Sequence, residues 1–581
     1  MTSGIVNAKV RWYISFILGV LFGALVFFTL YGWEILNVTY EDWLLTGWYD
    51  LSQHYVGWQL FRASDWMFPV GLMDNGFYPY PISVIYSDSI PLFCVFFKIL
   101  SPLLPETFQF FGIYGLLCFM LQGGFAKLLL RRVLNSEIKC CVACVPFVFC
   151  APVWQRLYYH TALASHFLIL AAFVLFMYRD RIENVYKRVA LWCGLGMLCI
   201  TIHFTIYSIV SVVFLGYAFW ELLEKAGECK RAEEGRKKTM LLSFKRFFLF
   251  LLPYLLSSVF IFWILGGFYG NISGVSDGLG AYSANLNSLF NPIDYSRIIK
   301  EFPLIDCQYE GLSYIGIMAI IMIIPACAFF IRNFRDIFSK HRYFIISVFT
   351  TSVILWVIAL SPIVTFNSHV LFEIPLPDFL YDAWSIYRAS GRFLWPNMYL
   401  VILFVLYYAS KEIKPYFGAV LVLGCLLQLF EFSEKTETIS EEYSKEAVAH
   451  FAADRLDLYD WDGIKHLQFM HPYTFPEFYD DEVRDQMIGY TRFAIRHGMT
   501  VSNFHFSRDD MDKLKNRIED CYLELFEEGP GEDTVYVFLR DGETYEEMKN
   551  TYKNARFIFT DKEILAVKED KLQDNYSKRN K

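Results

Sequence analysis

A series of apolar runs, each of about the length needed to cross a membrane, most constrains how this chain can fold. The runs lie near residues 12–32, 110–130, 140–158, 163–178, 189–203, 205–222, 247–266, 313–331, 343–361, 396–410 and 415–432. A transmembrane helix needs about 20 mainly apolar residues, and runs of about 15 need buried neighbours or a locally thinner bilayer. We therefore expect about eleven membrane-spanning helices. No polar loop separates 189–203 from 205–222, so these two runs could also form one broken helix.

Charge is distributed unevenly along the 581 residues, and this predicts two parts. Charged residues make up 19% of the chain, against about 25% in soluble proteins, and they concentrate in residues 433–581. We expect an α-helical polytopic membrane domain over 1–432 and a soluble domain over 433–581. In the second part, short strand-like runs alternate with amphipathic helical stretches, which predicts a small α/β fold. The strand-like runs are Lys465–Met470, Thr534–Leu539, Ala555–Phe559 and Ile564–Val567, and the helical stretches are Tyr490–His497, Arg508–Phe526 and Thr544–Asn550.

The loops between the apolar runs predict an orientation. Basic clusters occur at 9–11, 131–139, 179–188, 225–246, 332–342 and 411–414. With eleven spans, all of these clusters fall on one side, which by the positive-inside rule is cytoplasmic. The N-terminus is then cytoplasmic, with 12–32 as a signal anchor. The outer loops 33–109, 267–312 and 362–395, and the C-terminal part, are then extracytoplasmic. The Pro-bracketed run 90–104 is expected to be a surface helix, because one more span would invert every later loop.

Composition also excludes several classes of partner and site. The formal net charge is -8, and no basic tail or basic helical face indicates nucleic-acid binding. The 13 cysteines lie mostly in apolar segments, where cysteine behaves as a small hydrophobic residue, and none has the spacing of a zinc site. Cys307 and Cys521 fall in polar regions and could pair only if both face the same compartment.

The first outer loop, 33–109, holds a dense group of carboxylates and aromatic residues. Helical spacing puts Asp50, His54 and Trp58 on one face of a helix, with Gln53 beside them. A carboxylate next to an imidazole and an amide at the membrane surface can serve as a general base. The alternative is a solvated amphipathic helix whose aromatic residues anchor at the lipid headgroups.

The order of three runs in this loop resembles a known superfamily. Asp50 opens the amphipathic helix, the run SDWMFPVG (Ser64–Gly71) forms an Asp-Trp-x-x-Pro turn, and the run DSIPL (Asp88–Leu92) begins a surface helix. This order is similar to the first outer loop of the GT-C membrane glycosyltransferases, such as protein O-mannosyltransferases and aminoarabinose transferases. Asp50 matches the first acid of that superfamily's Asp-Glu motif, and DSIPL stands where its Lys-Pro-Pro-Leu run lies.

The resemblance covers most of the membrane part. It is closer to a bacterial branch of the superfamily, through DxxQH at 50–54, QYEG at 308–311 and RASGRF-WP at 388–396. The chain departs from the better-known families in two ways, since Leu51 follows Asp50 where a second acid is expected and the Lys of Lys-Pro-Pro-Leu is absent. These departures argue against a donor site identical to that of the better-known families. They also argue against a metal site that requires a pair of carboxylates.

The superfamily uses polyprenyl-phosphate sugar donors, so the resemblance implies a site for a lipid-linked phosphate. Arg388 and Arg392, four residues apart at the outer end of an expected helix, are the candidates for binding it. The alternative is an ion pair with a loop carboxylate such as Asp382. The resemblance also implies a second acid or acceptor contact from a later outer loop, and Glu310 is the candidate. The alternative for Glu310 is a carboxylate at the positive end of a helix dipole.

Two further features of the sequence bear on the site, a set of histidines in or near the spans and a run rich in small polar residues. His160, His166 and His203 lie at or inside spans, but their spacing is not that of one ligand set, so no metal site is expected from them. No cofactor is certain, and a divalent cation stays open. The run GLGAYSANLNSLFNPID, 278–294, is rich in Gly, Ser and Asn and suits a mobile loop that covers a substrate.

The sequence therefore favours a glycosyltransferase of the cell envelope. Its catalytic candidates are Asp50, Asp88 and Glu310, with His54 and Gln53 as supporting residues. The expected reaction moves a sugar from a polyprenyl-phosphate donor to an extracytoplasmic glycan, lipid or protein acceptor, with inversion. A flippase of lipid-linked sugars would instead require ionisable residues or broken helices near mid-membrane. A scaffold that has lost catalysis is the third reading, which the missing second acid after Asp50 keeps open.

Overall fold

The computed structural model describes residues 2–46, 49–270, 278–445, 447–472, 481–539, 548, 550–552, 554–559 and 563–568. Within them the chain forms two compact units. Unit 1 comprises residues 1–38, 110–261 and 274–446, and unit 2 comprises 39–109, 262–273 and 447–581. The units therefore do not follow chain order, because the first outer loop belongs to the same unit as the C-terminal residues.

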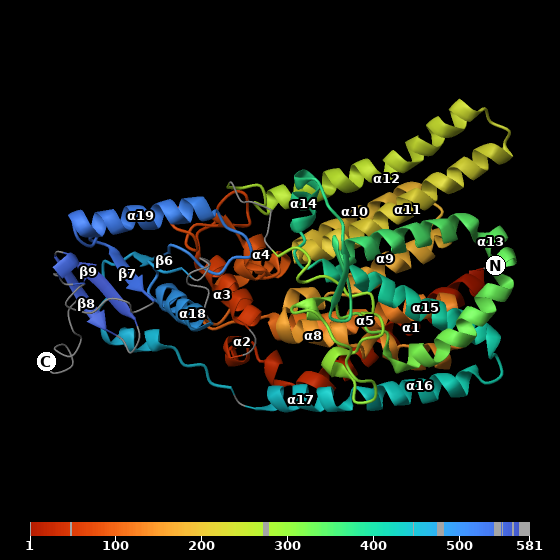
Figure 1. The fold of residues 1–581 in the computed structure, drawn as a ribbon, viewed down its shortest axis with the longest axis horizontal. Coiled ribbons are helices and arrows are strands. Elements are labelled where there is room, and N and C mark those ends of the chain that lie inside the picture. The colour runs from red at the N-terminus through yellow and green to blue at the C-terminus, as the bar shows by residue number, and fades with distance from the viewer. Residues whose placement is uncertain are drawn as a thin grey trace. The chain divides into compact units, whose positions relative to one another are not determined.

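Unit 1 is a bundle of helices (Figure 1). Its α-helices are α1 (Thr2–Tyr31), α5 (Phe111–Val133), α6 (Glu137–Val142), α7 (Val145–Val148), α8 (Ala151–Tyr159), α9 (Phe167–Met177), α10 (Val185–Ile202), α11 (Phe204–Arg231), α12 (Arg236–Ile264), α13 (Gly316–Leu360), α14 (Asp378–Ser385), α15 (Trp395–Glu412), α16 (Phe417–Glu431) and α17 (Ser433–Ser444). Short 3-10 helices are η1 (Glu34–Leu36), η4 (Thr161–Ala164), η5 (Arg179–Arg181), η6 (Ile293–Tyr295), η7 (Gln308–Gly311) and η8 (Ser390–Leu394).

The helices of unit 1 are those of a polytopic membrane protein. Seven helices in the described residues are long and apolar enough to cross a membrane, or nine if each of two bent helix pairs forms one span. Small residues let neighbouring helices approach closely, as membrane helices require. A Cβ added to Gly19 of α1 would lie 2.2 Å from the carbonyl oxygen of Gly123 on α5, and one added to Gly123 would lie 2.0 Å from that of Gly19. The backbones of α1 and α5 are therefore in direct contact.

Two pairs of expected spans differ in how the structure joins them. The runs 313–331 and 343–361 lie in α13, which consists of two helical segments that meet at a break where the backbone of His341 is non-helical. The helix turns back on itself in Figure 1. The runs 189–203 and 205–222 form two separate helices, α10 and α11, because His203 adopts an extended conformation between them and caps α11 through its ring nitrogen.

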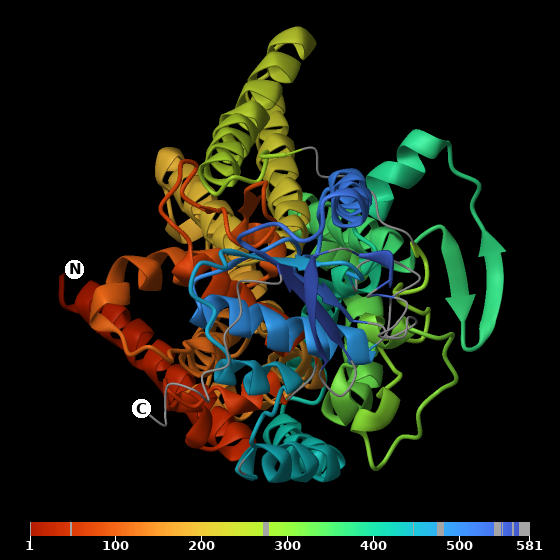
Figure 2. The same cartoon turned by 90° about the vertical axis from the view of Figure 1, so that its left-hand side faces the viewer.

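A β-hairpin interrupts the helices of unit 1 between α13 and α14. Strand β3 (Ile363–Phe366) pairs antiparallel with β4 (His369–Glu373). All five residues of β4 are exposed, including Val370, Leu371 and Phe372. Figure 2 shows the hairpin standing clear of the helices of its own unit.

Unit 2 contains a five-stranded sheet with the strand order β6-β5-β7-β9-β8. The strands are β5 (His466–Phe469), β6 (Thr500–Val501), β7 (Thr534–Phe538), β8 (Ala555–Phe559) and β9 (Ile564–Lys568). Strands β5, β6 and β7 are parallel, and β9 runs antiparallel to β7 and β8. The connections through α18 (Asp481–Arg496) and α19 (Met511–Glu527) place these two helices on opposite sides of the sheet (Figure 1). Cys521 and Leu525 of α19 pack on β7 and β9 in one apolar cluster.

The first outer loop supplies most of the rest of unit 2 and extends this sheet. Its elements are α2 (Asp42–Leu45), α3 (Tyr49–Ala63), β1 (Leu72–Met73), β2 (Ile82–Ser83), η2 (Val84–Ser87), α4 (Pro91–Leu100) and η3 (Ser101–Leu103), and η9 (Ala452–Leu458) precedes β5. At the edge strand β6, the amide of Tyr78 donates to the carbonyl of Val501, whose own amide donates to the carbonyl of Asn75. The Tyr78 ring also stacks on that of His466, 4.0 Å away. The loop is thus part of the sheet's fold.

Several expectations from the sequence can be placed on these elements. The helix expected around Asp50–Phe61 is α3, and the surface helix expected over 90–104 is α4 with η3. The helical stretch Thr544–Asn550 lies for the most part outside the described residues. All 13 cysteines are free, including Cys307 and Cys521.

Candidate functional site

A buried group of three ionised side chains joins the QYEG and RASGRF runs in unit 1. Arg156 on α8 donates through Nη1 to Oε1 of Glu310 at 3.1 Å, and its Nη2 lies 2.9 Å from Oε2. Arg392 on η8 donates through Nε to Oε2 of the same carboxylate at 2.8 Å. The side chains of Arg156, Glu310 and Arg392 are only 2%, 9% and 13% exposed. We call these three residues the Glu310 cluster.

Close backbone packing brings the two runs together. A Cβ on Gly391 would lie 2.8 Å from the Cα of Gly311, so neither run tolerates a side chain at this contact. The amide of Gly391 donates to the carbonyl of Tyr282 at 3.1 Å. Gln308, at the start of the QYEG run, donates to the hydroxyls of Ser283 and Thr365. The contact between Gly311 and Gly391 therefore holds η7 against η8. It thereby holds Glu310, on η7, close to Arg392, on η8.

The electrostatics of the Glu310 cluster favour a bound anion. Burial alone would raise the pKa of the Glu310 carboxyl, but the charges and hydrogen bonds of Arg156 and Arg392 hold this pKa well below its usual range. The carboxylate is thus ionised, and two guanidiniums against one carboxylate leave a formal charge of about +1. Among the described residues, Nε of Arg156 is buried without a hydrogen-bond partner.

Arg388 belongs to the same run as Arg392 but lies in a different setting from the one expected. It occupies an exposed bend between α14 and η8, with its guanidinium carbon 4.8 Å from the ring centre of Tyr282. The expectation that Arg388 and Arg392 both lie on the first turns of one helix is wrong, because Arg388 is in a bend and Arg392 is on a 3-10 helix. The alternative pairing with Asp382 is not found in the described part of the chain, where Arg392 pairs with Glu310.

Glu310 also differs from its alternative reading as a helix-start carboxylate. It lies on η7, which ends at Gly311, and α13 begins only at Gly316. Its two oxygens are directed to guanidiniums rather than to the first amides of a helix. Its role is therefore set by Arg156 and Arg392.

The Gly-, Ser- and Asn-rich run 278–294 is fixed by hydrogen bonds. Asn285 donates to Oε1 of Gln308 and to the carbonyl of Asn367, and Asn287 donates to the side chain of Asn367. Asn285 is fully buried and Asn287 nearly so. The hypothesis of a mobile cover over this run is not supported, because its polar side chains are used in a buried network.

The second group of candidate residues lies on α3 in unit 2. Asp50 in the first turn is half-buried, whereas Gln53, His54 and Trp58 are buried. The indole of Trp58 donates to the carbonyl of Phe108 at 3.0 Å. The alternative of a solvated helix anchored at headgroups is wrong for this face, because α3 packs on α18 and on the loop around it.

Asp88 reaches this helix through a strained turn. Asp88 and Ile90 both adopt left-handed backbone conformations, with φ of 55° and 60°. This is unfavourable for a β-branched residue and is typical of sites where a side chain is held in a fixed place. The hydroxyl of Ser89 donates to the carbonyl of His54 at 2.7 Å, and a Cβ on Gly57 would lie 2.6 Å from Ser87 and Ser89 atoms.

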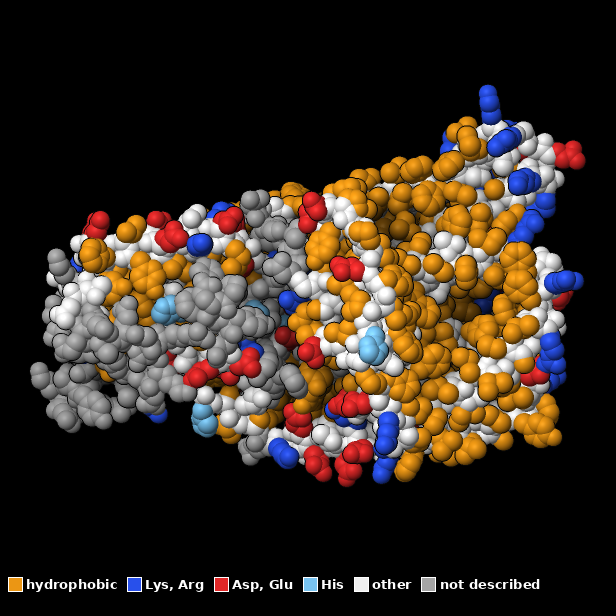
Figure 3. Space-filling view, in the orientation of Figure 1, with side chains coloured by type: hydrophobic (Ala, Val, Ile, Leu, Met, Phe, Trp, Pro, Cys, Tyr) orange, Lys and Arg blue, Asp and Glu red, His pale blue; other side chains and the backbone are white. Residues whose placement is uncertain are grey.

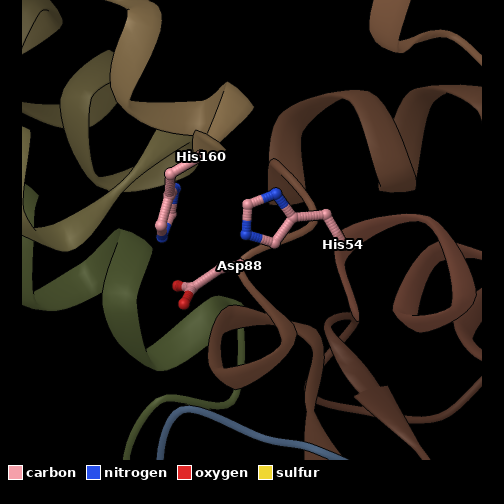
Figure 4. A group of neighbouring side chains, drawn as sticks. All are labelled: His54, Asp88 and His160. Atoms are coloured by element: carbon pink, nitrogen blue, oxygen red, sulfur yellow. The ribbon is translucent and has the colours of Figure 1, made fainter. Parts of the chain in front are cut away.

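The close contact between α3 and this turn brings His54 to Asp88. A ring nitrogen of His54 and a carboxylate oxygen of Asp88 lie within 4.8 Å of each other. Figure 4 shows the two side chains projecting from their elements into the same space. His160, also drawn there, belongs to unit 1. A carboxylate beside an imidazole can orient that ring and stabilise its protonated form.

The Asp-Trp turn of the first loop is held by a buried lysine. Lys98 on α4 donates to the hydroxyl of Ser64 at 2.8 Å and to the carbonyl of Asp65, and its ammonium lies over the rings of Phe61 and Trp66. Burial lowers the pKa of Lys98 to about 8. The turn is therefore a structural feature of unit 2, and Lys98 of the following helix, α4, holds it in place.

The three histidines of unit 1 do not form one group. The rings of His160 and His203 lie 5.1 Å apart, whereas His166 bonds to the hydroxyl of Tyr399 and packs against Trp395.

Sequence reasoning missed Arg156, which is central to the Glu310 cluster. Its signal was present, because Arg156 is the one charged residue in the apolar run 140–158. An ionisable residue inside such a run usually has a buried partner. The partner could not be identified from the sequence, since Glu310 lies 154 residues further along the chain.

Comparison with known proteins identifies a family for both parts of the chain. The family model described as Domain of unknown function (DUF6311) matches residues 20–433. The model described as DUF6311 C-terminal domain matches residues 456–567. No curated protein matches the sequence.

Proposed function

This chain belongs to the family described as Domain of unknown function (DUF6311), and from its structure we propose that it is a membrane glycosyltransferase. It moves a sugar from a polyprenyl-phosphate carrier to an acceptor on the extracytoplasmic side of the membrane. The acceptor is a glycan, a lipid or a protein of the cell envelope, and nucleic acid is not a partner. The sequence resemblance to the GT-C superfamily and the arginine-rich site of unit 1 support this proposal.

The Glu310 cluster together with Arg388 is the observation on which the proposal rests. Two guanidiniums contact the Glu310 carboxylate, and a third, that of Arg388, lies over the ring of Tyr282, whose carbonyl accepts from Gly391 next to Arg392. Arg388 is exposed, has no ion pair with a described residue, and is oriented by the Tyr282 ring. A planar guanidinium in this setting can form two parallel hydrogen bonds to a phosphate.

The proposed reaction is a single displacement at the anomeric carbon. A hydroxyl oxygen of the acceptor forms a bond to this carbon as the bond to the phosphate oxygen breaks, so configuration inverts. The polyprenyl phosphate leaves with the electron pair, and Arg388 stabilises its negative charge. The acceptor's proton passes to a carboxylate base. Asp50 is the candidate base, and Asp88 beside His54 is the second candidate.

Glu310 has a positioning role in this scheme. Its low pKa makes it a weak base at neutral pH, and both of its oxygens already accept from guanidiniums. We assign it to holding Arg156 and Arg392, whose excess positive charge favours an anion at Arg388. No metal ion is required by this step, and a divalent cation stays open as a cofactor.

We further propose that the chain crosses the membrane eleven times, with its N-terminus in the cytoplasm. The break at His341 divides the 45 residues of α13 into two segments of about 20 residues or more, and each is long enough to cross a bilayer, so α13 accounts for two crossings. The other six long helices, the two bent pairs and the shorter apolar helix Thr161–Met177 account for the remaining nine. All of these segments lie in the described residues.

The distribution of basic side chains supports this orientation. Lys and Arg gather at the end of the bundle formed by the α13 turn and the α11–α12 connection, and apolar side chains cover the helices between (Figure 3). By the positive-inside rule this end is cytoplasmic. Unit 2, which joins the first outer loop to the C-terminal sheet, is then extracytoplasmic, and we propose that it is a soluble α/β domain that binds the acceptor.

The test is a turnover assay in membrane vesicles that contain the full-length protein. A mixed pool of labelled lipid-linked sugars is supplied, and release of polyprenyl phosphate is measured. Replacing the base should slow turnover roughly 10²- to 10⁴-fold, so we expect this loss in Asp50→Asn. Asp520→Asn, an exposed carboxylate on α19, is the matched control and should be unchanged. Loss in Asp88→Asn alone would assign the base to Asp88, and no turnover in the parent protein would refute the proposal.

A flippase of lipid-linked sugars is the second candidate, and one observation favours it. Two helix pairs are bent by 44° and 51°, and Arg156 lies on the first pair, Glu137–Val148 with Ala151–Tyr159. Broken helices with buried charges are typical of transporters. The same vesicles distinguish the two functions, because a flippase moves the intact lipid-linked sugar across the bilayer and releases no polyprenyl phosphate.

A further inference from the structure

Three segments of unit 2 enclose a small pocket that the proposed reaction does not use. Its walls come from the first outer loop at Phe77–Ile82, from Tyr269 and Gly270 after α12, and from the start of α19. The pocket has a volume of about 280 Å³. This is just below the roughly 300–1,000 Å³ of sites for drug-sized ligands, so one small ring fits better than an extended chain.

Three aromatic residues, Phe77, Tyr80 and Tyr269, are among the residues that line this pocket. Tyr80 and Tyr269 are 38% and 42% exposed, whereas Phe77 is buried. Partly exposed rings in a concave site offer flat faces for a ligand with an apolar face, and a phenol adds a hydroxyl at the rim. The contact surface is therefore amphipathic rather than purely apolar.

The polar side of the pocket is a charge-balanced pair on the first turn of α19. The ammonium of Lys513 lies 2.9 Å from a carboxylate oxygen of Asp510, and it also lies 5.0 Å from the ring centre of Tyr80. The other role of Asp510 is to cap α19, because its side chain accepts from the amide of Lys513 at 3.2 Å. The carboxylate is thus held in place by two contacts.

The ion pair of Asp510 and Lys513, next to aromatic rings, favours a neutral ligand that carries hydroxyl groups. The net charge of Asp510 and Lys513 is zero, so neither an anion nor a cation is favoured by the field of the pair. The pair still offers both an acceptor and a donor to hydroxyl groups. An entirely apolar ligand would leave these groups without compensation, which is unfavourable.

We propose that this pocket binds a neutral sugar ring, with the C–H face of the ring on Tyr80 and Tyr269 and its hydroxyls on Asp510 and Lys513. On the proposed function, which this inference extends, the ring belongs to the acceptor, and the acceptor is therefore a glycan or glycosylated molecule. Sugar binding at this pocket does not depend on the lipid phosphate site.

The test uses the full-length protein in nanodiscs and saturation-transfer NMR with free methyl glycosides. The probes are the methyl glycosides of glucose, galactose, mannose and N-acetylglucosamine, with methyl glucuronide as the anionic comparison. We expect transfer to the ring C–H protons of at least one neutral glycoside, and less to the glucuronide. Removing one ring platform should weaken binding roughly tenfold in Tyr80→Ala and in Tyr269→Ala.

Controls separate the pocket from non-specific contact and from misfolding. Phe526→Ala removes an aromatic side chain that is 60% exposed on the same helix and should leave the transfer unchanged. Tyr269→Phe keeps the ring and should retain most of the binding. No transfer from any neutral glycoside, or equal transfer in the parent and both alanine variants, would overturn the proposal.

The result is also independent of the proposed transferase activity. Arg388→Gln should lose the lipid phosphate and keep the glycoside signal. If the glycoside binds but no polyprenyl phosphate does, the proposed function fails and the pocket stands. If the phosphate binds and no glycoside does, the pocket assignment fails alone.

Discussion

Unit 1 contains a second group with the same composition as the Glu310 cluster, and the two differ in what surrounds them. In the second group, Glu221 on α11 lies 2.8 Å from Nε of Arg179 and 3.0 Å from Nη2 of Arg188. We call these three residues the Glu221 cluster. Its carboxylate, like that of Glu310, is almost completely buried.

The arginines of the Glu221 cluster have other partners. Nη1 of Arg188 donates to the carbonyls of Ile182 and Glu183, and the guanidinium of Arg179 stacks on Trp220. A second carboxylate, Glu224, accepts from the indole of Trp220, so two acids stand near the two arginines.

The Glu310 cluster is not balanced in this way, since two arginines share one carboxylate and the neighbouring run adds Arg388, four residues before Arg392. The comparison suggests that a buried Arg–Glu–Arg group can be a structural brace or a binding site. The neighbouring charge decides which: a balanced group joins helices, whereas an excess of positive charge attracts an anion.

Removing the carboxylate gives the largest expected effect and separates the two clusters. Glu310→Gln leaves two nearly buried guanidiniums without their counter-charge and should destabilise unit 1 by about 3–5 kcal/mol. Glu221→Gln should cost less, about 1–3 kcal/mol, because Arg188 keeps its carbonyl acceptors and Arg179 is 21% exposed. Thermal unfolding of the purified proteins in detergent measures both. Equal losses of stability in the two variants would contradict the proposed difference between the two clusters.

Acid titration isolates the contribution of Glu310. Its pKa is lowered in the folded protein, so its stabilising effect is fully present above the unfolded pKa and is lost as pH falls through the folded pKa. The melting temperature of the parent should therefore fall more steeply below about pH 4.5 than that of Glu310→Gln. Parallel curves from pH 7 to pH 3 would show that the carboxylate is not held by its two arginines.

The smallest expected effect concerns the ring beneath Arg388. Tyr282→Leu removes a cation–π contact worth about 0.5–1 kcal/mol at an exposed site, so polyprenyl phosphate should bind roughly two- to fivefold more weakly. Tyr282→Phe keeps the ring and should bind as the parent does. Lipid titration measured by native mass spectrometry detects the change. A larger loss in the Phe variant than in the Leu variant would show that the hydroxyl, and not the ring face, matters.

The sequence predicted the local features of unit 1 better than its long-range contacts. Apolar runs of spanning length predicted a polytopic membrane protein, because a helix in lipid must satisfy its backbone within itself. The runs 313–331 and 343–361 likewise correspond to two helical segments, which meet at the break at His341. Short runs such as 163–178 form helices that are too short to be identified as membrane spans by length alone.

At the candidate site, too, the sequence predicted which residues share a helix but not which distant residues come into contact. The spacing of Asp50, His54 and Trp58 predicted that they lie on one helix, and that helix is α3. The pairing of Glu310 with Arg392 depends on close packing of Gly311 on Gly391, which no local pattern reveals. Likewise, the approach of Asp88 to His54 depends on Gly57 and on the left-handed turn at Asp88 and Ile90.

The central claim is that Arg388, backed by the Glu310 cluster, binds a lipid phosphate. The most direct measurement is titration of polyprenyl phosphate into the full-length protein in phosphatidylcholine nanodiscs, where the carrier is the only anionic lipid. Arg388→Gln should weaken binding roughly 10- to 100-fold, because hydrogen bonds to charged groups contribute about 1.5–3 kcal/mol. Arg332→Gln, an exposed arginine of the same unit, is the matched control and should stay within about twofold of the parent. Binding of equal strength in the parent and Arg388→Gln would contradict the account.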